Sequence, residues 1–354
     1  MSEPGLVARL KPLAGNLLIS VVLAAGFVWM FQRGGLPFLP TREVVAHVRW
    51  WCVPAYAGVL LLATALRTYR WVYLLRAITP VDNKRVLGVG LVGYGVILFA
   101  PLRAGELARP LMIAGEGQVT FTQATGTVAA ERIIDGFIVS LILLAGILSA
   151  PTLDPLPDHL GTLPLPIKAV PRAAYMALTV FTAAFAAMGI FYWARDFARR
   201  LTHSIVGVIS EKLASFLTSK VERVADGLAF LPSREHGLPF FRDTFLYWCA
   251  CIALSFVGLR GCGVPVTFAQ NLALMGVMGL GILIPSGPGF FGAYQLAGYC
   301  ALAMFFPEPT VLGPGAAFVF VSYTSQLVVT LLGMGVGAFL LRKPKGPAAG
   351  EITP

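Results

Sequence analysis

Three charged residues follow a long apolar stretch and are spaced to act together. Val86–Ala100 contains no charged residue, and "LRAGELAR" then places Arg103, Glu106 and Arg109 at intervals of three. A helix that begins near Pro101 would carry all three side chains on one face. Guanidinium groups beside the unpaired N–H groups of a helix N-terminus can bind phosphate, and Glu106 can pair an arginine or attract a cation. The alternative interpretation is an ion-pair cluster that only holds a turn together.

A second charged group, "ERIID", lies within an apolar segment. Glu131 and Asp135 are four residues apart, so a helix places both acids on one face, and Arg132 lies beside them. A charge at the centre of a bilayer costs at least about 2.5–3.5 kcal/mol, so such residues mark either a substrate path or paired charges. Both interpretations stay open: the group can respond to a substrate or form salt bridges to the Arg103 cluster.

A third group, "RTYRW", places Arg67 and Arg70 three residues apart, next to Trp71 and close to Tyr73. Arginine beside aromatic residues at a membrane interface suits a lipid phosphate. It equally suits anchoring, in which the long side chains reach the headgroups from the end of a spanning helix.

An uncharged segment, "IPSGPGFFGAYQ", offers neutral hydrogen-bonding groups and glycines that permit close backbone approach. We expect it to form an outer gate or the far half of the site. The residues assigned to the gate and to the turn near the first charged group are Pro101, Gly105, Pro285, Ser286, Gly287, Gly289, Tyr294 and Gln295. Ser325 and Gln326 are further polar candidates.

The elements that carry these residues must lie in a membrane. Of the 354 residues, 57% are hydrophobic and only 12% charged, whereas a soluble domain has about 25% charged residues. The sequence therefore predicts an all-α, polytopic transmembrane helix bundle that forms a single membrane domain over residues 1–354. The segments long enough to span are Leu13–Phe31, Val53–Ile78, Ala124–Ser149, Arg172–Ala194, Thr244–Cys262 and Gly315–Leu341.

Two apolar segments, Val86–Ala100 and Gln270–Ile284, are too short to span and stop at prolines. We expect both to be re-entrant, because broken backbone at membrane depth persists only where protein or a water-filled cavity covers it. Lys and Arg then collect on one side, which predicts an inner-membrane protein with cytoplasmic N- and C-termini.

The order of segments predicts an inverted repeat. Residues 53–149, with re-entrant segment 86–116, would match residues 244–341, with re-entrant segment 270–306, in the opposite orientation. Paired Gly/Pro-broken segments of this kind point to the substrate site of a transporter. Residues 195–236 have helical amphipathic spacing and are expected to form a cytoplasmic linker, either on the headgroups or packed on the bundle.

Several classes of partner are not expected. The formal net charge of +10 fits basic cytoplasmic loops and anionic lipids rather than nucleic acid, for which no motif is present. The five cysteines and four histidines form no cluster with metal-ligand spacing, so we expect no metal and no other cofactor. The expected partners are membrane lipids with an anionic or phosphate-bearing headgroup; a separate lipid-modifying synthase and a second copy of the chain are further candidates.

Together, "RTYRW", "LRAGELAR", "ERIID" and "IPSGPGFFGAYQ" resemble the transmembrane family of lysylphosphatidylglycerol synthases, also described as flippase-like proteins. This family includes the membrane domain of the bacterial multiple peptide resistance factor. The resemblance implies movement of a lipid between leaflets. Because the sequence ends soon after Leu341, it implies no attached aminoacyl transferase domain and no synthase activity.

The favoured function is therefore that of a lipid flippase or transporter. Its expected cargo is a phosphate-bearing lipid, with an aminoacylated lipid and a polyprenyl-linked lipid as two alternatives. In this hypothesis Arg103 and Arg109 take the phosphate, while Glu106, Glu131 and Asp135 balance charge. One alternative is a membrane-embedded glycosyl or aminoacyl transferase that acts on a lipid-linked substrate. Another is a scaffold of a lipid-synthesis complex that transports nothing.

Overall fold

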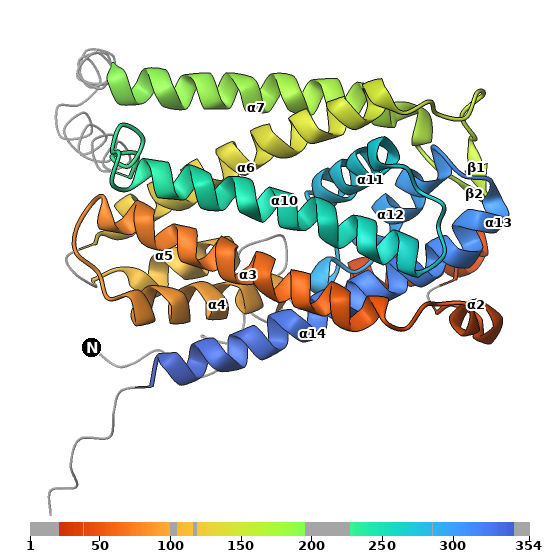
Figure 1. Cartoon of the computed structure of the whole chain (residues 1–354), viewed down its shortest axis with the longest axis horizontal. Coiled ribbons are helices and arrows are strands. Elements are labelled where there is room, and N and C mark those ends of the chain that lie inside the picture. Colours follow the sequence, from red (N-terminus) through yellow and green to blue (C-terminus); the bar gives the residue numbers. More distant parts are fainter. Residues whose placement is uncertain are drawn as a thin grey trace, which may run out of the picture.

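The structure, a computed structural model, describes residues 21–37, 39–99, 105–115, 119–194, 227–284 and 286–342. Within these residues, five helices are long and apolar enough to cross a bilayer: Cys52–Arg76, Phe121–Ser149, Ile167–Ile190, Gly237–Gly261 and Glu308–Leu340. The predicted all-α polytopic bundle is thus confirmed, and the chain is an integral membrane protein (Figure 1).

Helix Val21–Gly34 comes first among the described residues. The elements that follow are α2 (Arg42–Ala46), α3 (Cys52–Arg76), α4 (Asn83–Phe99), α5 (Ala108–Ile113), α6 (Phe121–Ser149), β1 (His159–Leu160), β2 (Leu163–Pro164), η3 (Ile167–Ala169), α7 (Val170–Trp193), α10 (Gly237–Gly261), α11 (Phe268–Gly281), η4 (Pro288–Phe290), α12 (Ala293–Ala303), α13 (Glu308–Thr310), η5 (Val311–Gly315) and α14 (Ala316–Leu340).

The long helices run side by side along the long axis of the molecule (Figure 1). Helix α3 packs against α10, α6 packs against both α7 and α11, and α14 packs against α4. The short helices form two pairs at opposite ends: α4 with α5 at one end and α11 with α12 at the other.

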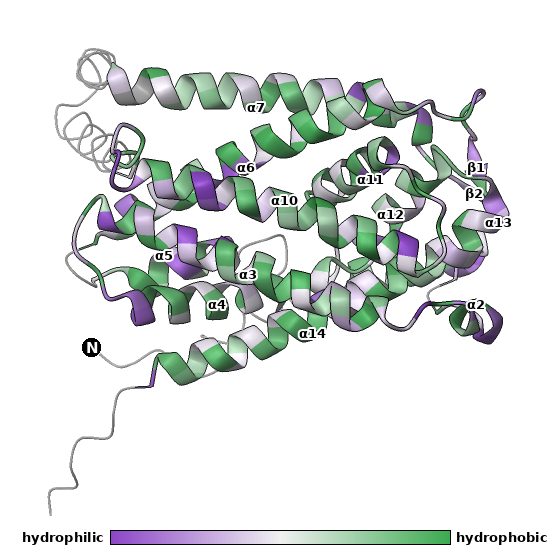
Figure 2. Cartoon of the chain, viewed as in Figure 1, coloured by the Kyte–Doolittle hydropathy of each residue, from purple (hydrophilic) through white to green (hydrophobic). Residues whose placement is uncertain are grey.

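Hydrophobic residues cover the bodies of the long helices, and hydrophilic residues gather near α2, β1 and β2 (Figure 2). Large apolar side chains such as Trp193 and Phe339 are exposed on the outer surface. In water such a surface would drive association, whereas in a bilayer it faces lipid tails.

Local sequence signals explain where two of the helices begin. Thr120 accepts a hydrogen bond from the backbone N–H of Gln123, and the Gln123 side chain accepts one from the Thr120 backbone N–H. Thr267 and Gln270 repeat this capping box at the start of α11. Each box satisfies N–H groups that have no partner within the helix.

The predicted spans needed small corrections at their ends. The last one begins at Glu308 rather than Gly315, because the π-helical turn Val311–Gly315 accommodates Pro314 without ending the helix. The loop after α6 contains a two-stranded antiparallel hairpin, β1 with β2, which the sequence analysis did not predict. Residues 13–20 of the first predicted span and 195–226 of the predicted linker lie outside the described residues, and 227–236 forms turns.

Two glycines set the close crossing of α6 and α11. A Cβ on Gly146 would lie 2.7 Å from the Ala273 Cα, and a Cβ on Gly276 would lie 2.8 Å from the Leu143 Cα. Small residues allow membrane helices to approach closely, since packing rather than hydrophobic burial holds them together.

Replacement of Gly146 by leucine is therefore expected to push α6 away from α11 and destabilise the protein by roughly 1–3 kcal/mol, the usual cost of overpacking. The melting temperature of the purified protein in detergent measures this. Gly335→Leu is the matched control, because a Cβ there meets nothing within 4 Å. Equal melting temperatures for the two variants would contradict the role assigned to this crossing.

Candidate functional site

Arg70 lies at the centre of a buried ion cluster. From α3 its Nη1 donates to Asp135 Oδ1 at 2.8 Å, and its Nη2 donates to Glu131 Oε1 at 3.1 Å and also to Asp135 Oδ2. Arg70 and Glu131 are fully buried. Glu131 and Asp135 share one face of α6 because they are four residues apart, so one guanidinium can bridge both carboxylates.

Arg109, on α5, is the second fully buried arginine of the cluster. Its Nη2 pairs with Glu131 Oε2 at 3.0 Å. The guanidinium lies 4.2 Å from the centre of the Trp71 ring and 4.9 Å from that of Tyr94. Arg109 is therefore held by a carboxylate and two aromatic faces, an arrangement that stabilises a charge away from water.

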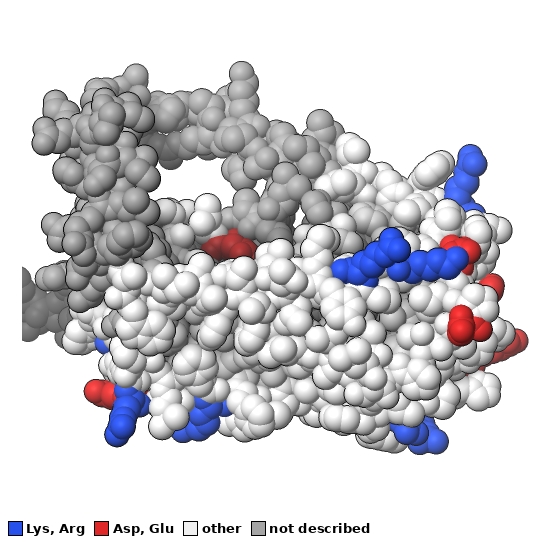
Figure 3. Space-filling view, turned by 90° about the horizontal axis from the view of Figure 1, so that it is seen from above, with Lys and Arg blue, Asp and Glu red and all other residues white. Residues whose placement is uncertain are grey.

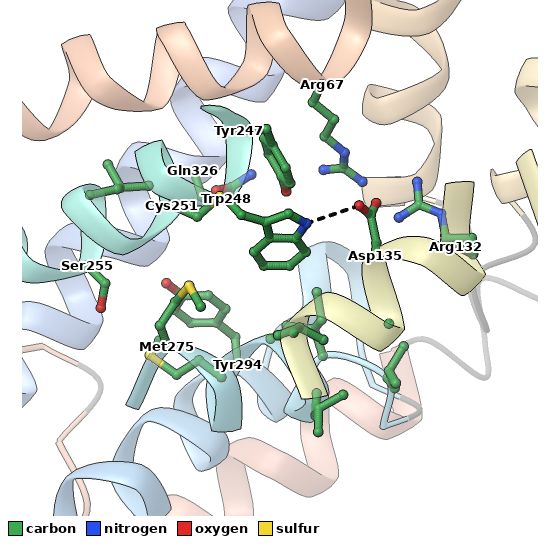
Figure 4. Close-up of a pocket in the computed structure, with 18 of the residues that line it drawn as sticks. Arg67, Arg132, Asp135, Tyr247, Trp248, Cys251, Ser255, Met275, Tyr294 and Gln326 are labelled. Atoms are coloured by element: carbon green, nitrogen blue, oxygen red, sulfur yellow. Dashed lines mark hydrogen bonds between the residues drawn. The ribbon is translucent and has the colours of Figure 1, made fainter. Parts of the chain in front are cut away.

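Two further arginines are less completely paired. The Arg67 guanidinium lies 4.0 Å from the centre of the Tyr94 ring, and no carboxylate among the described residues forms an ion pair with it. Arg132 Nη2 lies 3.3 Å from Glu131 Oε1, and its side chain is 25% exposed. Figure 4 shows both guanidinium groups directed toward Asp135, whose Oδ1 also accepts a bond from the Trp248 indole at 3.3 Å.

A cavity of about 720 Å³ adjoins this cluster and is lined by α3, α6, α7, α10, α11, α12, α14 and the turn before α5. Its ionic lining consists of Arg67, Glu106, Arg132 and Asp135. Its neutral polar lining consists of Tyr56, Tyr247, Trp248, Ser255, Tyr294 and Gln326, and apolar side chains such as Val139, Leu254, Met275, Met278, Leu280 and Phe318 supply most of the rest. Figure 3 shows acidic atoms inside a hollow on one face, away from the charged residues toward the ends of the molecule.

The charged part of the cavity lies near the middle of the spanning helices. Asp135 is 14 residues from either end of α6, which corresponds to about 21 Å at 1.5 Å per residue. Trp248 is similarly central in α10. Because the hydrocarbon core is about 30 Å thick, charged groups at this depth face protein or a polar cavity rather than lipid tails.

Three cavity-lining side chains carry a buried polar atom that the described residues leave without a hydrogen-bond partner: Arg67 Nε, Arg132 Nε and Ser255 Oγ. An unpaired buried donor or acceptor typically costs about 1–3 kcal/mol. Because these atoms are buried, they lie within the wall of the cavity rather than open to it.

The structure brings together most of the charged residues singled out in the sequence. Glu106 lines the cavity, whereas Arg109 lies behind it in the ion cluster. Of the helix expected from Pro101, residues 105–107 form a 3₁₀ turn that leads into α5 at Ala108, while residues 100–104 lie outside the described residues. Arg103, Pro101 and Pro285 lie outside the described residues.

Most of the described residues assigned to the gate and to the turn before α5 have a structural role, and one of them lies at the cavity. Gly105 is buried, and a Cβ there would lie 2.6 Å from the Ile97 Cα, so the turn before α5 rests directly on α4. Gly289 has φ +70°, and Gln295 caps α12 by accepting from the Gly292 N–H at 2.8 Å. Ser286 and Gly287 are buried in the same turn, outside the lining of the cavity, whereas Tyr294 faces it (Figure 4).

Sequence reasoning missed the contribution of α10. Tyr247, Trp248 and Ser255 line the cavity but were not singled out. The signal was present: an indole N–H and a tyrosine hydroxyl in the middle of a spanning helix, far from either interface, need buried partners.

These features define a polytopic membrane protein with an amphipathic cavity beside a mid-membrane ion cluster. In a comparison with known families, the family described as lysylphosphatidylglycerol synthase TM region matches residues 17–333. The chain belongs to this family. The family named from the sequence is thereby confirmed, and a membrane role related to lipids is consistent with it. Comparisons with curated proteins and with solved structures found no match.

Proposed function

We propose that the protein moves a phosphate-bearing lipid between the leaflets of a bacterial inner membrane. The observation that carries the proposal is the cavity itself, which offers guanidinium groups at the middle of the bilayer and an apolar lining next to them. A lipid headgroup would cross through the polar part while its acyl chains stay among apolar side chains and bilayer lipids.

Charge in and behind the cavity favours an anionic cargo. Among the described residues, four arginines face three carboxylates, which leaves a formal excess of one positive charge: Arg67, Arg70, Arg109 and Arg132 against Glu106, Glu131 and Asp135. Arg70 and Arg109 are committed to Glu131 and Asp135, so Arg67 and Arg132 are the groups that meet the phosphate. Guanidinium and phosphate form strong, charge-assisted hydrogen bonds.

We further propose that the two halves of the chain form an inverted repeat around this cavity, with two re-entrant hairpins. Equivalent contacts support this. The packing of α4 on α14 has its counterpart in α11 on α6, and the pair α4–α5 has its counterpart in α11–α12, while α3 packs on α10 between the halves. Such repeats commonly place the substrate site at their interface.

The end of the molecule where α3 ends, α4 begins and α14 ends is proposed to face the cytoplasm. Arg76, Lys84 and Arg342 lie there, in agreement with the excess of Lys and Arg in cytoplasmic loops.

Reconstitution into liposomes tests the proposed function. We expect labelled phosphatidylglycerol to move between leaflets in the presence of the protein, and mass spectrometry to recover it chemically unchanged. Appearance of a modified lipid would instead favour a membrane-embedded transferase. If the lipid neither moves nor changes, the transport proposal is wrong and a scaffold role takes its place.

A further inference from the structure

A second hollow lies on the outside of the bundle, between α3, α4 and α14, which are neighbours in the fold (Figure 1). It has a volume of about 540 Å³ and shares no lining residue with the central cavity. Leu61, Leu62, Leu332 and Val336 line it, and each is more than half exposed, so in a bilayer the hollow is open to lipid. We call this hollow the outer groove.

The body of the outer groove suits an acyl chain. Its lining is almost entirely apolar, and the hydroxyls of Thr64 and Thr68 already donate to backbone carbonyls one turn earlier in α3, at 2.8 and 2.7 Å. Along α14 the groove extends from Leu340, at the end of the helix, to Val329. These eleven residues correspond to about 16 Å, close to half of the 30 Å thickness of the hydrocarbon core.

One end of the outer groove carries a buried carboxylate that is paired with an exposed arginine. Asp243 lines the groove and is 4% exposed. Its Oδ1 accepts from the Nε of Arg242 at 2.8 Å and lies 2.8 Å from Nη2. The same Nη2 donates to the Tyr73 hydroxyl at 3.4 Å, and the Tyr73 ring packs edge-on against Tyr69, which lines the groove. The guanidinium is therefore held in one position beside the end of the groove.

The Arg242 guanidinium still has donors to offer. Its Nη1 carries two N–H groups, for which the described residues supply no acceptor, and the side chain is 62% exposed. Arg242 is five residues, or about 8 Å, from the start of α10, so it lies near the boundary between headgroups and hydrocarbon. Guanidinium and phosphate form strong, charge-assisted hydrogen bonds, and a lipid phosphate is found at this depth.

From this combination we infer that the outer groove binds a resident phospholipid, whose phosphate contacts Arg242 and one of whose acyl chains lies along Leu61 and Leu332. This lipid stays in its leaflet, because the polar groups lie at one end of the groove only and α3 separates the groove from the central cavity. It would fill the space between α3 and α14, which pack on each other less extensively than α3 packs on α10. The inference requires a membrane-spanning chain but not lipid transport.

Photo-crosslinking tests the inference. The probe is phosphatidylglycerol with a diazirine near the end of one acyl chain, added to the delipidated full chain in detergent. We expect crosslinks in peptides that contain residues 61–66, 87–91 and 329–336. Unlabelled phosphatidylglycerol should prevent this labelling, whereas diacylglycerol with the same acyl chains, which lacks the phosphate, should need a concentration about tenfold higher.

Two kinds of variant remove the phosphate contact. Arg242→Gln should raise the concentration of phosphatidylglycerol needed for half-maximal labelling about tenfold. Because this variant leaves Asp243 buried without its partner, Arg242→Gln combined with Asp243→Asn makes the same change without a stranded charge. Arg260→Gln is the matched control, since this arginine is exposed at the other end of α10 and does not line the groove.

A third variant, Gly333→Leu, fills the outer groove itself. A Cβ on Gly333 would meet only the Leu91 Cδ2, at 3.4 Å, so the helices need not move apart to accommodate it. Labelling of the groove peptides should then fall about tenfold or more, while Gly335→Leu, outside the groove lining, should be labelled like the wild type.

The outcomes separate this inference from the proposed function. If diacylglycerol competes as well as phosphatidylglycerol, or if the Arg242 variants are labelled like the wild type, the groove contacts bulk lipid only and the inference is overturned. It is also overturned if Arg67→Gln, a change in the central cavity, abolishes the same crosslinks. If the groove is labelled as expected but no lipid moves in liposomes, the transport proposal fails and the resident lipid stands.

Discussion

Replacement of Arg70 by glutamine is expected to destabilise the protein by about 3–5 kcal/mol, the cost of leaving a buried charge uncompensated. Arg70 bridges Glu131 to Asp135; without it Asp135 loses its ion-pair partner among the described residues, whereas Glu131 keeps Arg109 and Arg132. Because folded proteins are stable by only about 5–15 kcal/mol, most of the variant should be lost on extraction or melt on the order of 10 °C lower. The measurement is the monodisperse yield and melting temperature in detergent.

Two companion variants show whether charge balance is the cause. Arg76→Gln changes an exposed arginine at the end of the same helix and should leave stability within about 0.5 kcal/mol of the wild type. Adding Asp135→Asn to Arg70→Gln removes the carboxylate that has lost its partner and should recover part of the loss. If Arg70→Gln alone is as stable as the wild type, the ion cluster does not hold α3 to α6.

Replacement of Arg67 by glutamine is expected to reduce lipid transport about 10- to 100-fold with little loss of stability. A hydrogen bond to a charged group contributes about 1.5–3 kcal/mol, and 1.4 kcal/mol corresponds to a factor of ten. Arg67 faces the cavity, and no described carboxylate depends on it for an ion pair. The measurement is the initial rate of phosphatidylglycerol movement in proteoliposomes with equal amounts of protein.

Arg132→Gln should give a similar loss of transport together with a modest loss of stability, because Arg132 also contacts Glu131. Arg260→Gln is the control: Arg260 is an exposed arginine near the end of α10 and does not line the cavity. If a folded Arg67→Gln variant moves lipid at the wild-type rate, Arg67 does not bind the lipid phosphate.

Much of the fold followed from hydropathy, for a physical reason. In lipid each spanning helix must satisfy its own backbone hydrogen bonds, so length and apolarity alone mark the spans, as α3, α6 and α10 illustrate. Helix ends were less predictable, because they depend on local devices. The π-helical turn that contains Pro314 is one example, since a proline ordinarily signals the end of a helix.

The candidate site was only partly predictable. The cost of charge in a bilayer singled out Glu131, Asp135 and Arg70, but nothing in their spacing revealed that Arg70 bridges the two acids rather than reaching the headgroups. That pairing depends on how α3 crosses α6. The neutral residues were harder still, since Ser255 and Tyr56 become a site only when α10, α3 and α12 converge on one cavity.

The most direct test of the account is the structure of the protein by electron cryomicroscopy in nanodiscs of phosphatidylglycerol. A lipid phosphate within hydrogen-bonding distance of Arg67 and Arg132, with acyl chains along Met275 and Met278, is the predicted result. A cavity filled by water or acyl chains alone, with every headgroup at the membrane surface and none beside these arginines, would contradict it.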